Sequence, residues 1–116
     1  FIVLAGFIWL VPENIIELYH GRIINIHPAL LPGYGGKGMY GEAVHKAVVE
    51  NREAESGITI HYVNKHYDEG DIIFQSRCKV DPADTNLTLA EKIHALEYLH
   101  YPAIIEELVT KLSDFN

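Results

Sequence analysis

Asn25 and His27 stand at the end of a short apolar run, where further apolar residues would be expected. The stretch 22–27 begins like a buried strand and ends at Pro28. Side chains alternate along a strand, so both residues project from one face, on the order of 7 Å apart along the backbone. The pair therefore offers an amide and an imidazole to a common ligand. A polar strand end that hydrogen-bonds a neighbouring loop fits the pattern equally well.

Asp68 lies in an acidic turn, HYDEGD, over residues 66–71. Taken alone, such a turn is more often solvated than catalytic, and its interest depends on whether it approaches His27. Its spacing lacks the alternation of a calcium loop. The sequence also contains neither HExxH nor CxxC, so no metal site is expected. Cys78 has no activating neighbour in sequence and is interpreted as structural.

The apolar pattern predicts one α/β domain over residues 1–116. Strands are expected over 2–5, 22–27, 57–63 and 71–80, the last two as a hairpin. Helices are expected over 12–19 and 42–51, and a third opens at a TLAE capping box, residues 88–91, with Pro102 breaking or kinking it. Its buried stripe is predicted to be Leu89, Ile93 and Leu96. The first strand–helix–strand unit should pair two parallel strands, and α/β sheets bind ligands beyond the carboxyl ends of such strands.

Composition limits the classes of partner. The formal charge is −7, which argues against nucleic acid, and no apolar run approaches the length of a membrane span. A single cysteine favours a reducing compartment, here expected to be the cytoplasm. The chain starts directly on an apolar run without an initiator Met, which indicates a fragment. The sequence does not indicate an oligomeric state.

Five motifs occur in order along nearly the whole chain: AGF at 5–7, NIHPALLP at 25–32, GITIHYV at 57–63, DEGDII at 68–73 and LEYLHYP at 96–102. Together they resemble the folate-dependent formyltransferases, most closely the members that formylate glycinamide ribonucleotide in purine synthesis. The resemblance implies a Rossmann-like fold with a mixed, mostly parallel sheet, a β-hairpin and flanking helices. Residues 1–116 would be its catalytic and folate-binding portion, without the N-terminal half that binds the substrate phosphate.

The resemblance also implies roles for individual residues. Asn25 and a protonated His27 would stabilise the oxyanion that forms when an amine attacks the formyl group of 10-formyltetrahydrofolate, the co-substrate, without a metal. Asp68 would orient His27 and accept the proton of the amine. Glu97 would hold the sugar hydroxyls of the ribonucleotide, although a solvent-facing helix carboxylate is the simpler interpretation. Thr59 and His61 would support the site. The folate pocket would be formed by Ile8, Trp9, Leu10, Val11, Ile23, Lys65, His66, Tyr67, Glu69 and Gly70.

Three features depart from the family pattern. Trp9 replaces an Arg and Glu69 replaces a Gly found in many members, and the loop 33–41, GYGGKGMYG, lacks the commoner Gly-Leu-His. Without the phosphate anchor, residues 1–116 alone are expected to be inactive. The alternatives are a 10-formyltetrahydrofolate hydrolase, a sugar-nucleotide formyltransferase and a non-catalytic folate-binding module. The negative charge disfavours a formyltransferase that acts on methionyl-tRNA.

Overall fold

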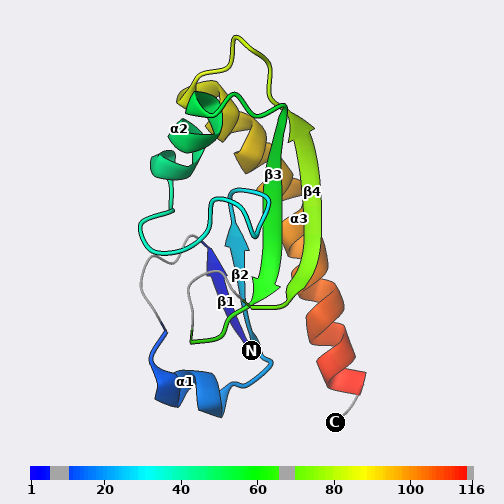
Figure 1. Ribbon diagram of the computed structural model, residues 1–116. Coiled ribbons are helices and arrows are strands. Elements are labelled where there is room, and N and C mark those ends of the chain that lie inside the picture. Colours follow the sequence, from blue (N-terminus) through cyan, green and yellow to red (C-terminus); the bar gives the residue numbers. More distant parts are fainter. Residues whose placement is uncertain (6–10, 66–69, 115–116) are drawn as a thin grey trace.

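The computed structural model describes residues 1–5, 11–65 and 70–114. Four strands form one sheet in the order β1-β2-β3-β4 (Figure 1). The strands are β1 Ile2–Ala5, β2 Ile23–His27, β3 Glu55–Tyr62 and β4 Ile72–Lys79. The helices are α1 Glu13–Leu18, α2 Glu42–Glu50 and α3 Asn86–Asp114. The strands and helices expected from the sequence are therefore all present, with ends shifted by a few residues.

The sheet is mixed. β1 and β2 pair in parallel and are joined through α1, which confirms the predicted crossover unit. β2–β3 and β3–β4 are both antiparallel, the latter as the predicted hairpin. Among the described strands, one pair is parallel and two pairs are antiparallel, whereas we expected a mixed sheet that is mostly parallel. The reason is that β3 enters antiparallel to β2 after α2, and a hairpin partner is antiparallel by necessity.

The two faces of β2 have different surroundings, although every residue of the strand is buried. Ile24 and Ile26 belong to the main hydrophobic core together with Ile58 and Ile60 of β3. The predicted stripe of α3 covers this face: Leu89 and Ile93 are fully buried there, and Leu96 packs against the cluster. By alternation, the other face of β2 carries Ile23, Asn25 and His27. The core thus fixes which face the polar pair occupies.

The start of α3 differs from the expected capping box. The Thr85 hydroxyl accepts a hydrogen bond from the Thr88 backbone N–H at 3.2 Å, and the Thr88 hydroxyl accepts one from the Thr85 N–H at 2.9 Å. This reciprocal pair is a capping box with Thr85 as the N-cap. The predicted box at Thr88–Glu91 was wrong by one turn, because Thr85 offers the same hydroxyl three residues earlier.

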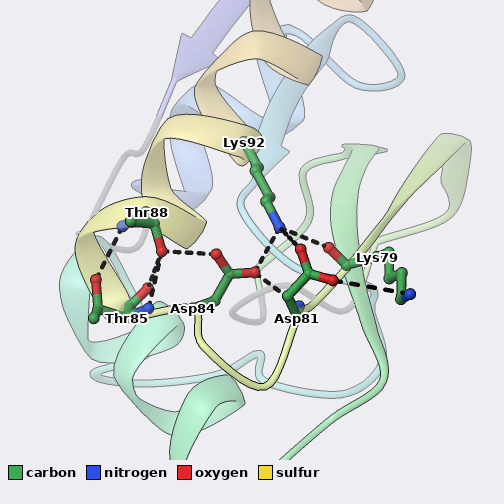
Figure 2. Close-up of polar contacts among 6 residues, drawn as sticks. All are labelled: Lys79, Asp81, Asp84, Thr85, Thr88 and Lys92. Carbon is green, nitrogen blue, oxygen red and sulfur yellow. Dashed lines mark hydrogen bonds and ion pairs between the residues drawn. The ribbon is translucent and has the colours of Figure 1, made fainter.

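Asp84 fixes the same helix end through an ion pair (Figure 2). Its carboxylate accepts hydrogen bonds from Lys92 Nζ at 2.6 Å, from the Thr88 hydroxyl at 2.7 Å and from the Asp81 N–H at 2.8 Å. The Asp84 side chain is only 7% exposed. These bonds, the one to Lys92 above all, lower the pKa of Asp84 to about 2. The loop between β4 and α3 is therefore tied to the first two turns of the helix.

Pro102 does not break α3, which continues to Asp114, so the first of the two predicted outcomes was wrong. A proline inside a helix leaves the carbonyl four residues earlier without its usual donor. That residue is Tyr98, which is 82% exposed, so its carbonyl lies on the side of the helix where water can replace the missing N–H. Among the described residues, no helix, α3 included, combines the length and the apolar character needed to cross a bilayer.

Candidate active site

Asn25 and His27 lie side by side on the polar face of β2, as the alternation predicted. Both are almost fully buried, at 7% and 3% exposure. Asn25 is opposite His61 in the β2–β3 pairing, and His27 is opposite Thr59. The two residues expected to support the pair are thus its direct cross-strand neighbours. Four polar side chains gather on one buried patch of the sheet, and such a buried group requires internal hydrogen bonds.

His61 contacts the Asn25 amide directly. Asn25 Nδ2 lies 3.3 Å from His61 Nε2, and the other ring nitrogen, Nδ1, lies 3.0 Å from the carbonyl oxygen of Tyr62. Asn25 Oδ1 is buried and has no hydrogen-bond partner among the described residues. A buried amide oxygen without a partner is uncommon and is a suitable acceptor for a ligand.

Thr59 holds the turn that follows His27. Its hydroxyl donates to the Ala29 carbonyl at 2.7 Å and accepts from the Leu31 N–H at 3.0 Å. Gln75 Nε2, from β4, donates to the same hydroxyl at 3.0 Å and to the Leu31 carbonyl at 2.9 Å. Sequence reasoning missed Gln75, although a polar residue within an alternating strand could have drawn attention to it.

Tyr34 is a second residue that sequence reasoning missed. His27 Nε2 donates a hydrogen bond to the Tyr34 carbonyl oxygen at 2.6 Å. The Tyr34 hydroxyl donates to Glu53 at 2.8 Å and accepts from Asn51 at 3.0 Å. Burial, the largest influence, raises the pKa of Tyr34, so this hydroxyl remains a donor at neutral pH. The 33–41 loop therefore places a backbone oxygen on His27, where it competes with any substrate oxygen for the same N–H.

Glu97 lies on α3, half-buried, close to Tyr101. Burial raises the pKa of Glu97, and nearby His94 partly offsets this effect. The Tyr101 hydroxyl, one turn further along α3, donates to the Leu4 carbonyl. Leu4 is the β1 partner of Asn25. The Tyr101–Leu4 hydrogen bond thus connects the helix that carries Glu97 to the strand pair that carries Asn25. Because the Glu97 side chain is half-buried, it is not the freely solvated carboxylate of the simpler interpretation.

Several predicted site residues lie outside the described residues. They are Asp68, Ile8, Trp9, Leu10, His66, Tyr67 and Glu69. Of the predicted folate residues that are described, Ile23 is buried on the Asn25 face, Val11 is half-buried and Lys65 is exposed. Gly70 packs tightly on β3, since a Cβ there would meet the Tyr62 carbonyl oxygen at 1.5 Å. Close packing is therefore sufficient to explain a glycine at that position.

An open pocket of about 710 Å³ lies elsewhere, between the end of α2 and the β4–α3 loop. Three of its charged side chains are engaged in ion pairs, Asp84 with Lys92 and Lys79 with Asp81. Neither Asn25 nor His27 lines it. Among the described residues, no group of three His, Cys, Asp or Glu side chains could hold a metal ion. The lining residues are Val49, Arg52, Glu53, Ala54, Lys79, Val80, Asp81, Pro82 and Asp84.

Comparison with known proteins assigns this arrangement to a family. Residues 1–105 match the family described as "Formyl transferase". The chain belongs to the formyl transferase family. This match confirms the resemblance drawn from the motifs, and it includes both Asn25 and His27.

Two relatives within the family are named phosphoribosylglycinamide formyltransferase. The chain is 46% identical over 105 residues to the chloroplastic phosphoribosylglycinamide formyltransferase of Arabidopsis thaliana, covering 90% of this chain and 36% of that protein. It is 40% identical over 108 residues to the Bacillus subtilis phosphoribosylglycinamide formyltransferase, covering 93% of this chain and 53% of the relative. The chain thus spans between about a third and a half of the length of these formyl transferases.

Solved structures of the family share the fold. The phosphoribosylglycinamide formyltransferase of Bacillus halodurans superposes with a TM-score of 0.85 at 38% identity, over 97% of this chain and 55% of that one. The enzyme of the same name from Streptococcus pneumoniae gives a TM-score of 0.82 at 34% identity, over 92% and 57%. The α/β fold with its mixed sheet and hairpin is therefore that of these formyl transferases.

Proposed function

We propose that the chain provides the reaction centre for transfer of a formyl group from 10-formyltetrahydrofolate to the amine of glycinamide ribonucleotide. The observation that carries the proposal is the buried Asn25–His27 pair at the carboxyl end of β2, in a chain 40–46% identical to relatives named for this ribonucleotide. Because the chain spans only part of those relatives, donor, acceptor and overall reaction all belong to the proposal.

The chemistry requires stabilisation of a negative charge on oxygen. The amine nitrogen attacks the formyl carbon, a new C–N bond forms, and the carbonyl oxygen becomes an oxyanion. The bond from that carbon to N10 of the folate then breaks, and tetrahydrofolate leaves with a proton. Donors held in a buried site stabilise such an oxyanion more than water does. Asn25 Nδ2 and the imidazolium of His27 are the donors that we assign to it.

His27 must exchange one acceptor for another during this reaction. Its Nε2 proton is bonded to the Tyr34 carbonyl in the structure. For Nε2 to reach the oxyanion, the 33–41 loop has to withdraw that carbonyl. The loop contains five glycines, and Gly36 and Gly38 have φ of +94° and +83°. Such backbone is accessible to glycine at low cost, which gives the loop room to rearrange.

The remaining roles follow from the family resemblance. We assign to Asp68 the orientation of His27 and the removal of the amine proton, directly or through water. The folate would lie along Val11, Ile23, Lys65 and Gly70 and the adjoining predicted residues 8–10, 66, 67 and 69. Glu97 would accept hydrogen bonds from the sugar hydroxyls of the ribonucleotide. These assignments require no metal ion.

The location in the cell also belongs to the proposal. A single cysteine, Cys78, favours a reducing compartment, and we propose the cytoplasm. Burial is the main effect on the Cys78 thiol and raises its pKa, which suits a structural role. Fractionation of cells that produce the protein, followed by detection in each fraction, tests the location. Recovery in an organelle would contradict it.

The experiment that tests the function uses the complete polypeptide in which these residues occur. It is incubated with 10-formyltetrahydrofolate and glycinamide ribonucleotide, and both products are quantified by mass spectrometry. Formylated ribonucleotide and tetrahydrofolate in equal amounts support the proposal. Free formate that forms at the same rate without ribonucleotide would instead identify a hydrolase, and binding of the folate with no product would identify a binding module.

A further inference from the structure

We propose that His61 is a positioning residue that fixes the orientation of the Asn25 amide. In this orientation one N–H and the Oδ1 of Asn25 are directed to the reacting groups. The inference deepens the proposed function and rests on it for its kinetic part. Its geometric part, the hydrogen-bond chain from Tyr62 through His61 to Asn25, stands independently of any activity.

The chain of hydrogen bonds has a defined direction. The Tyr62 carbonyl can only accept, so His61 Nδ1, 3.0 Å away, carries the proton. In the neutral ring, Nε2 then has a lone pair and can only accept. Asn25 Nδ2, 3.3 Å from Nε2, is the donor of that bond. The tautomer of His61 thereby decides which end of the Asn25 amide faces the ring.

The reverse orientation of the amide is unfavourable. It would place Asn25 Oδ1 against the lone pair of Nε2, so that two acceptors would face each other. Asn25 and His61 are 7% and 3% exposed, so water cannot easily mediate between them. The amide oxygen is consequently directed away from His61, and it has no partner among the described residues. We assign this oxygen as the acceptor for an N–H of the attacking amine, while the second amide N–H faces the oxyanion.

The backbone around His61 is suited to this role. Tyr62 is held in place by its own N–H bond to the Asp71 carbonyl at 2.9 Å and by its pairing with Ile24. The β3–β4 ladder shows a register shift between Ile60 and His61. Such bulges twist a strand locally and re-aim side chains, and they are frequent beside active sites. A fixed carbonyl and a bulge together determine the position of the His61 ring.

The kinetic test compares variants of the complete polypeptide. His61→Phe keeps the ring shape but removes both ring nitrogens, and we expect kcat to fall between about 10- and 100-fold with KM for the folate within about twofold. In Asn25→Ala, kcat should fall about 10²–10³-fold. Adding His61→Phe to Asn25→Ala should lower kcat by less than about twofold further, because His61 acts through Asn25. The proposal would be overturned if His61→Phe lowered kcat by the same factor in the wild-type and Asn25→Ala proteins. It would also be overturned if His61→Phe alone had the kcat of the wild type.

Two controls separate positioning from general destabilisation. Ile58→Val removes a methylene from the same strand on the opposite, core face and should leave kcat unchanged. His61→Gln retains an acceptor oxygen within reach of Asn25 and should recover at least several-fold of the kcat lost in His61→Phe. A loss of kcat in Ile58→Val comparable to that in His61→Phe, or no recovery in His61→Gln, would show a merely structural role.

A spectroscopic measurement decides the geometric part without activity. Nitrogen-15 NMR of the wild-type protein should show His61 with a protonated Nδ1 and an unprotonated Nε2 at neutral pH. In Asn25→Ala the Nε2 resonance should shift, because it loses its donor. A protonated Nε2 in the neutral wild-type ring would overturn the inference. If the tautomer is as expected and no formyl transfer is detected, the proposed function fails, and with it the kinetic role of His61.

Discussion

Thr59 lies directly opposite His27 in the β2–β3 pairing and holds, through one hydroxyl, the turn that follows it. The chain leaves β2 at His27, and both Ala29 and Leu31 are hydrogen-bonded to Thr59 within the next four residues. The strand end and the turn are therefore fixed by a single buried side chain. This explains how His27 can be held rigidly although it is the last residue of its strand.

Replacing Thr59 by Val should destabilise the protein by about 1–3 kcal/mol. The change keeps the shape of the side chain but leaves the buried Ala29 carbonyl and Leu31 N–H without their partner. Chemical denaturation of the complete polypeptide measures the loss. Thr59→Ser is the matched control, since it keeps the hydroxyl and should cost less. Equal stability of the Val and wild-type proteins would show that the turn is held by other contacts.

Replacing His27 by Ala should abolish most formyl transfer while the protein still binds the folate. His27 is assigned to the oxyanion, and removing one such donor costs about 10²–10³-fold in kcat. Rates are measured with both substrates, and folate binding is measured by calorimetry. His20→Ala, at an exposed position between α1 and β2, is the control and should be fully active. Near-normal transfer by the His27 variant would rule out the proposed mechanism.

The strands and the polar pair could be predicted because they depend on local patterns. Alternation places Asn25 and His27 on one face whatever packs around them, and the apolar runs of 2–5 and 22–27 mark strands. Only the second strand is covered on both faces as expected, because β1 is an edge strand of the described sheet with Val3 41% exposed. The buried stripe of α3 follows from spacing for the same reason. These features require no knowledge of contacts distant in sequence.

Other features of the site could not be predicted, because they depend on contacts between segments or on backbone atoms. The bond from His27 to Tyr34 uses a main-chain carbonyl, which any residue at position 34 would possess. The N-cap of α3 is Thr85 rather than Thr88, and Asp84 holds the loop before it through contacts with Thr88 and Lys92 in the first two helical turns. Pro102 is tolerated because the side of the helix that loses a donor is exposed.

The stability of the β4–α3 connection should depend on pH through Asp84. Its pKa is lowered to about 2 from a usual value near 3.8, mainly by the hydrogen bond from Lys92. A carboxyl group with a lower pKa in the folded state stabilises the fold above its unfolded pKa, and this contribution is lost as pH falls from about 4 to about 2. Urea unfolding of wild type and Asp84→Asn at pH 7 and at pH 2.5 measures this. We expect the variant to be less stable at pH 7 and the difference to shrink at pH 2.5.

Asp81→Asn is the matched control for the Asp84 prediction. Asp81 also faces Lys92, at 3.2 Å, but its side chain is 53% exposed against 7% for Asp84. An exposed ion pair contributes little to stability. The free energy of unfolding of the Asp81 variant should therefore be close to that of the wild type at both pH values. If the Asp81 and Asp84 variants lost equal stability at pH 7, the lower exposure of the Asp84 side chain would not explain its larger contribution.

Gly57 is required by close packing at the start of β3, and Gly57→Ala should destabilise the protein by about 3 kcal/mol or more. A Cβ at this position would meet the Ser76 carbonyl oxygen of β4 at 1.9 Å and Leu30 Cδ2 at 2.8 Å. The first obstacle is backbone within the β3–β4 ladder, so relief requires the strands to separate. Gly33→Ala is the matched control, because its Cβ would meet its nearest neighbour, the Leu30 carbonyl oxygen, at 3.4 Å. Thermal unfolding of both variants should show a large loss of stability for Gly57→Ala and little loss for Gly33→Ala. Equal stability of the two variants would contradict the packing described for Gly57.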